Sequence, residues 1–157
     1  MPPARLIDTI AARHLPQVLI FVQPPPIPAA PVPAQVLSAH RVFISNGEST
    51  GTIWPSSLVY DAFYAGIKSW GKYEIVSAPA ESDVVFEVRY LVGVPPGTPE
   101  RVQLFLIDPK THITLWNCST RIEVWGRDDT GRKNFEAAIA ALLGDVKRIA
   151  ASSDETK

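Results

Sequence analysis

The segment that most constrains the fold runs from Leu104 to Trp116, where two apolar, β-branched and aromatic runs flank a short turn. The turn begins with Asp108 and Pro109. An aspartate side chain can bond to its own backbone and proline fixes φ, so together they favour a reversal of the chain. Apolar runs on both sides of such a turn predict a β-hairpin. The protein must therefore contain antiparallel β-structure.

The hairpin supplies the last two of about five predicted strands. The other three strands are expected at residues 42–44, 73–76 and 84–92, and the final strand from Ile113 to about Trp125, with a bulge near Asn117. In the segment 84–92, Glu87 and Arg89 alternate with apolar residues such as Phe86. This alternation is typical of an antiparallel sheet with one face against helices and the other nearer water.

Two amphipathic helices are predicted, each with apolar residues at steps of three and four. The apolar stripes are Val59, Phe63, Ile67 and Trp70 in the first helix and Phe135, Ile139, Leu142, Val146 and Ile149 in the second. Gly71 is expected to end the first helix in a left-handed conformation. The predicted order is β-α-β-β-β-β-α. It is an α+β fold with a mostly antiparallel sheet of about five strands and two helices packed on one face.

Proline is concentrated near the N-terminus, where residues 24–33 contain six of the 15 prolines. Such a segment lacks backbone donors and favours polyproline II over helix or sheet. We therefore predict a Pro-rich tail over residues 1–38 that is dispensable for folding. A single α+β domain is expected over 39–151 and a frayed C-terminus over 152–157. Within the tail, an apolar stretch resembles a degenerate signal segment; the alternative is a non-native start ahead of the true domain.

Composition excludes several classes of protein. The net charge is −1, and the lysines and arginines are scattered, whereas a nucleic-acid binder usually carries a basic stripe. No run of about 18 apolar residues is present, so no transmembrane segment is expected. The single cysteine, Cys118, excludes an intramolecular disulfide.

Candidate catalytic, cofactor and metal sites are weak. The three histidines are far apart in sequence and lack the spacing of metal ligands. Cys118 lies in the middle of a predicted strand, where a buried and inert thiol is expected. The loop from Asn46 to Gly51 lies between a strand and a helix, as phosphate-binding loops do, but it has no lysine and carries Glu48. We therefore expect no catalytic residues, no cofactor and no metal.

Three aromatic residues lie outside the clearest core stripes: Trp54, Tyr60 and Trp125. They are candidates for a contact surface with a partner. The alternative is that each of them covers the edge of the core.

Residues 42–150 resemble a group of uncharacterised, acidobacterial-type secreted or envelope proteins. The matching segments are the strand 42–46, the helix end 67–71, residues 82–86, the hairpin turn 106–111 with its following Leu115 and Trp116, and the final helix. The layout is similar to that of periplasmic lipoprotein domains and of the N-terminal domain of the Tol translocation protein. The resemblance implies a small α+β domain in the periplasm or outside the cell, with the cytoplasm as the alternative. Because Cys118 is the only cysteine, no lipid anchor is expected.

Two functions remain open. The first is a non-catalytic envelope or secreted interaction domain with an unidentified protein partner. The second is a small-ligand binder or enzyme with a pocket near the loop from Asn46 to Gly51. Since the sequence shows no cluster of acid-base groups, the first function is favoured. The oligomeric state is not predicted.

Overall fold

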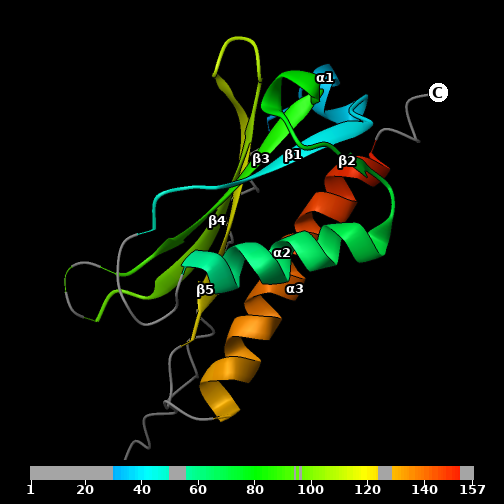
Figure 1. Cartoon of the computed structure of the whole chain (residues 1–157). Helices are drawn as coiled ribbons and strands as arrows, with labels where there is room; N and C mark the ends of the chain where they lie inside the picture. The colour runs from blue at the N-terminus through cyan, green and yellow to red at the C-terminus, as the bar shows by residue number, and fades with distance from the viewer. Residues whose placement is uncertain (1–29, 50–55, 94, 96, 124–128, 153–157) are drawn as a thin grey trace, which may run out of the picture. The chain divides into compact units, whose positions relative to one another are not determined.

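The computed structural model describes residues 30–49, 56–93, 95, 97–123 and 129–152. Residues 31–157 form one compact unit, which is the part considered below. Its strands are β1 (Arg41–Asn46), β2 (Glu74–Ile75), β3 (Val84–Leu91), β4 (Glu100–Ile107) and β5 (Thr114–Ile122). Its helices are α1 (Ala34–Leu37), α2 (Ser56–Trp70) and α3 (Asp129–Ala151), with a 3₁₀ turn at Pro79–Glu81 (Figure 1).

The strands form a mixed sheet in the order β2-β1-β3-β4-β5. Strands β3, β4 and β5 are antiparallel neighbours with long ladders, whereas β1 runs parallel to both β2 and β3. Parallel neighbours need a crossover connection, and α2 provides it between β1 and β2. The predicted α+β fold with a mostly antiparallel sheet is confirmed, and the parallel pairings of β1 are an addition to it.

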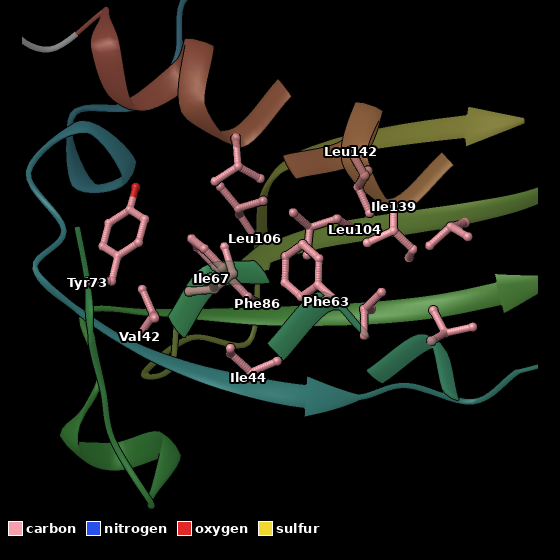
Figure 2. Packing of buried hydrophobic residues seen from close by; sticks show 14 of the residues in the cluster. Val42, Ile44, Phe63, Ile67, Tyr73, Phe86, Leu104, Leu106, Ile139 and Leu142 are labelled. Carbon is pink, nitrogen blue, oxygen red and sulfur yellow. The ribbon is translucent and has the colours of Figure 1, made fainter. Parts of the chain in front are cut away.

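Both long helices pack on the same face of the sheet, as predicted (Figure 1). Figure 2 shows Phe63 and Ile67 of α2 beside Phe86 of β3, with Ile139 and Leu142 of α3 nearby. Alternate residues of the central strands complete this core: Val42, Ile44, Val84, Phe86, Val88, Tyr90, Val102, Leu104 and Leu106. The sheet therefore has one face buried against helices and one face turned away from them.

The two long helices approach each other closely at Gly66. A Cβ atom at this position would overlap the side chain of Leu143 in α3, so the missing side chain allows the contact. Gly71, with φ of 69°, directly follows α2, and its N–H donates to the carbonyl of Ile67. The predicted left-handed end of this helix is confirmed.

The β4–β5 hairpin differs from its prediction in the position of the irregularity. The register shift lies between Leu106 and Ile107, opposite Leu115, rather than near Asn117. It follows directly on the turn, where the carboxylate of Asp108 accepts hydrogen bonds from the N–H of Lys110 (3.0 Å) and the hydroxyl of Thr111 (2.7 Å). The strand ends at Ile122, earlier than expected; Trp125 lies outside the described residues.

The predicted Pro-rich tail overlaps with α1. Val36 in this helix is only 3% exposed and belongs to the hydrophobic core. The amide of Gln35 donates to the carbonyl of Asp83 (3.0 Å), which lies before β3. The packed structure thus begins earlier than residue 39, because one apolar side chain after the last prolines finds a place in the core. We propose Pro31 as its start; the division into tail, domain and frayed end remains a prediction.

The packing of the inner face of α3 can be tested by shortening one of its buried side chains. Leu142 is fully buried, so Leu142→Ala should lower the free energy of unfolding by about 2–5 kcal/mol. Lys133→Ala, at an exposed position of the same helix, should change it by less than about 0.5 kcal/mol. Urea denaturation followed by circular dichroism measures both variants. Equal effects would show that α3 does not pack as described.

The start of the packed structure can be tested with two shortened chains. A chain beginning at Pro31 should melt within about 3 °C of the full-length protein, whereas one beginning at Ala39 should be less stable by about 1–3 kcal/mol. The difference is expected because the second chain lacks the buried side chain of Val36. Calorimetry measures both transitions. If the two shortened chains melt alike, α1 does not stabilise the fold.

Candidate interaction surface

The sheet face opposite α2 and α3 is the candidate functional surface and is referred to below as the open face. Strand residues that alternate with the core positions form it. They are Phe43 and Ser45 of β1; Val85, Glu87, Arg89 and Leu91 of β3; Arg101, Gln103, Phe105 and Ile107 of β4; and Thr114, Asn117, Ser119 and Arg121 of β5. All three described helices contribute their buried residues to the core on the other face.

The strand register arranges the open face in rows with different chemistry. At the hairpin end, Val85 is paired with both Phe43 and Ile107, which gives an apolar row. At the other end of the strands, Arg101 is paired with Arg121, which gives a cationic row, and Leu91 of β3 flanks Arg101 on its other side. Residues paired across neighbouring strands point to the same side of a sheet, so each row is continuous in space. The face therefore changes from apolar to cationic along the strands.

Between these rows, Arg89 is held in place by its neighbours. Its Nε donates to the carboxylate of Glu87 (2.7 Å), and its guanidinium carbon lies 4.8 Å from the centre of the Phe105 ring. Gly47 makes room for this arrangement, since a Cβ atom there would lie 2.5 Å from Cγ of Arg89. The sequence correctly placed Glu87 and Arg89 on one face. Because Glu87 neutralises it, Arg89 adds little net charge to the surface.

The paired arginines of the cationic row lack such neutralisation. Arg101 is half-buried and Arg121 is exposed. The ion pairs between described residues involve Arg41, Arg89, Arg132 and Arg148, and neither arginine of the row takes part in one. Like charges directly opposite each other on neighbouring strands are destabilising. Sequence patterns did not predict this pair, because Arg101 and Arg121 meet only through the register of β4 and β5.

A hollow of about 460 Å³ adjoins the cationic row; it is lined by residues 97–100 and 121–123. Its floor includes Glu100, which is 7% exposed and accepts a hydrogen bond from the hydroxyl of Tyr90 (2.6 Å). Burial, together with the carboxylate of Glu100, raises the pKa of Tyr90 well above its usual range. The phenol therefore stays protonated as a hydrogen-bond donor, which suits a structural contact between β3 and β4.

A second hollow contains two carboxylates that are already engaged in holding the backbone. Asp83 accepts hydrogen bonds from the N–H groups of His40 (3.0 Å) and Arg41 (2.8 Å), which lower the pKa of its carboxyl. Asp108 is similarly held by its turn, chiefly by the N–H of Lys110, and its pKa is also lowered. Carboxyls with depressed pKa values remain ionised at neutral pH. They are therefore poor proton donors, and their hydrogen bonds to backbone N–H groups indicate a structural role.

Of the three predicted contact residues, Tyr60 is the one that the structure describes. Tyr60 lies on α2, half-buried, with its ring centre 5.9 Å from that of Tyr64. The two rings line a shallow groove with Ile44 and Ile75, beside the short edge strand β2. Trp54 and Trp125 lie outside the described residues. A contact role for these three aromatic residues remains a prediction.

The loop after β1 continues alongside β3 in its described part. The N–H of Gly47 donates to the carbonyl of Val88, and the hydroxyl of Ser49 accepts from the N–H of Tyr90 (3.1 Å). Thr50 and Gly51 lie outside the described residues, so a ligand pocket near this loop stays a prediction.

In the part of the chain that the structure describes, no three or more His, Cys, Asp or Glu side chains converge as a metal site would require. Over the same residues, no helix has both the length and the apolar character needed to cross a membrane.

The thiol of Cys118 is expected to react slowly. Burial, with a smaller contribution from Asp145, raises its pKa to about 11. At pH 8 the reactive thiolate should then be more than about a hundredfold scarcer than for a free cysteine. Iodoacetamide labelling followed by mass spectrometry measures the rate, with the protein unfolded in guanidinium chloride as the control. Labelling of the folded protein as fast as the unfolded control would contradict a raised pKa for this half-buried thiol.

Comparisons with known proteins identify the fold but no family. No family model matches the chain, and no curated protein matches its sequence. The PelC dodecamer of Paraburkholderia phytofirmans is 17% identical, with a TM-score of 0.51, over 74% of this chain and 94% of its own. A putative neuraminyllactose-binding hemagglutinin homolog from Helicobacter pylori is 11% identical, with a TM-score of 0.50, over 82% and 96%. A Xanthomonas campestris protein of the DUF330 family is 11% identical, with a TM-score of 0.51, over 83% and 96%. At these identities the chain shares its fold with the three proteins.

Proposed function

We propose that this protein is a non-catalytic interaction domain of the bacterial cell envelope, periplasmic or secreted, that binds a protein partner through its open face. The observation that carries the proposal is the one-sided packing of the sheet. The helices α2 and α3 bury one face. The other face presents an apolar row, an arginine held by Glu87, and two arginines without an ion-pair partner among the described residues. Aromatic residues and arginine are enriched in protein interfaces, and this face carries both Phe43 and Phe105 together with three arginines.

The proposed location rests on the resemblance of the sequence to secreted and envelope proteins. The fold supports a binding role by analogy alone, since one neighbour in structure is named as a homolog of a hemagglutinin. Another neighbour is named as a dodecamer. Self-association is therefore a second part of the proposal. The long edge strand β5 offers unpaired backbone groups for it.

The alternative of an enzyme receives less support from the site chemistry. General acid-base catalysis needs groups whose pKa values are poised near the working pH. Asp83 and Asp108 have lowered pKa values and the Cys118 thiol has a raised one, so all three are shifted away from that range. Their hydrogen bonds or burial explain these shifts without a catalytic role.

The proposal predicts that an aromatic residue in the middle of the open face contributes to partner binding. Phe105→Ala should reduce the amount of a specific partner retained from native envelope extract by about tenfold, since buried aromatic residues dominate interface energies. Glu136→Ala, at an exposed position of α3 on the other side of the sheet, is the matched control and should retain the partner. Quantitative mass spectrometry of immobilised, folded proteins measures both. Equal retention by the two variants would contradict the proposed surface.

A further inference from the structure

We infer that the cationic row, Arg101 with Arg121, is a docking site for an acidic segment of a partner polypeptide. This inference rests on the proposed function and specifies the chemistry of the partner at one end of the open face. It names a site that the sequence patterns did not reveal.

The geometry of the row concentrates positive charge. Arg101 and Arg121 are directly paired between β4 and β5, which places their Cβ atoms about 4.5–5.5 Å apart. No carboxylate of the described residues lies within ion-pair distance, 4.0 Å, of either guanidinium. A carboxylate placed between them could accept hydrogen bonds from both, in the planar geometry that guanidinium groups favour. Such an anion would convert a repulsive pair into a binding site.

Neighbouring residues extend the site without neutralising it. The next row along the strands pairs Gln103 with Ser119, whose amide and hydroxyl groups can donate hydrogen bonds. Arg89 lies beside Gln103 but is already bound to Glu87. The free positive charge of the open face is thus concentrated in its last row.

Two carboxylates lie near this row and limit what can bind. Glu123 is exposed and lines the hollow together with Arg121, and the buried Glu100 lines the same hollow. Both would repel an anion that entered the hollow itself. The acidic group is therefore expected over the sheet, between the two arginines and toward Gln103, rather than beyond the strand ends.

The apolar row identifies the acidic partner as a polypeptide. Ile107 lies six residues from Arg101 along β4, a distance of about 20 Å in an extended strand. An extended peptide of about six or seven residues could place an acidic side chain on the cationic row and aliphatic side chains on the half-buried Phe43 and Ile107, which flank the buried Val85. A nucleic acid or an acidic polysaccharide has no aliphatic side chains for the apolar row. A small free anion would contact only a flat, exposed surface.

The test uses the full-length protein, labelled with ¹⁵N, and a ten-residue synthetic peptide with two glutamates at one end and two leucines at the other. Addition of the peptide should shift the NMR signals of Arg101, Gln103, Ser119 and Arg121. The double variant Arg101→Gln and Arg121→Gln should raise Kd at least tenfold. Lys133→Gln on α3 is the control and should leave Kd unchanged. Binding should weaken as sodium chloride rises from about 50 to 300 mM, since the row is exposed to solvent.

Two control peptides test whether both the carboxylates and the aliphatic side chains contribute to binding. The same peptide with glutamine in place of glutamate should bind at least tenfold more weakly, and decaglutamate, which has no aliphatic groups, should also bind more weakly. The inference is overturned if the glutamine peptide binds equally well or if no peptide shifts the row. Tighter binding of dextran sulfate, or of vesicles containing anionic lipid, would also overturn it, because the partner would then belong to another class.

The same variants separate this inference from the proposed function. If Phe105→Ala loses the envelope partner while the double arginine variant keeps it, the open face is the contact surface but its acidic docking site is refuted. If both variants keep the partner, both proposals are refuted. Loss of the partner in both variants, with folding intact by circular dichroism, supports both.

Discussion

The burial of one sheet face against α2 and α3 is the interaction on which the rest of the structure depends. Phe63 and Ile67 of α2 and Leu142 of α3 are fully buried against the strands (Figure 2). The same contact explains the mixed sheet, since α2 returns the chain to the sheet as a crossover and leaves β2 parallel to β1. With both long helices on one side, the opposite face is formed, among the described residues, mainly by strand side chains.

Strand register then decides which of those side chains become neighbours. Val85 lies beside Phe43 and Ile107, whereas Arg101 lies beside Arg121. A shift of one residue between two strands would move these side chains to the helix face. The buried residues on that face therefore fix the register, and through it they fix the separation of apolar and cationic groups on the open face.

Local sequence patterns predicted most of the fold because they reflect interactions between residues that are close together in the chain. The turn at Asp108, the end of α2 at Gly71 and the apolar stripes of both helices each depend on residues close together in the chain. The contact residues depend on longer-range contacts that local patterns do not report. Tyr60, the one of them that the structure describes, lies half-buried on α2, and its contact role stays a prediction. The contribution of Val36 to the core was not predicted, since it closely follows a Pro-rich segment and its partners are distant in sequence.

The sequence by itself determined the five strands, the two long helices, the α+β class and the placement of these helices on one sheet face, since periodic burial encodes them. The tertiary structure alone decided that β1 lies between β2 and β3 and that α1 joins the core. It alone also paired Arg101 with Arg121, which are 20 positions apart in the chain. Such pairings depend on the register of strands that meet only after the chain has folded. No local pattern specifies that register, whereas the packing of the whole core does.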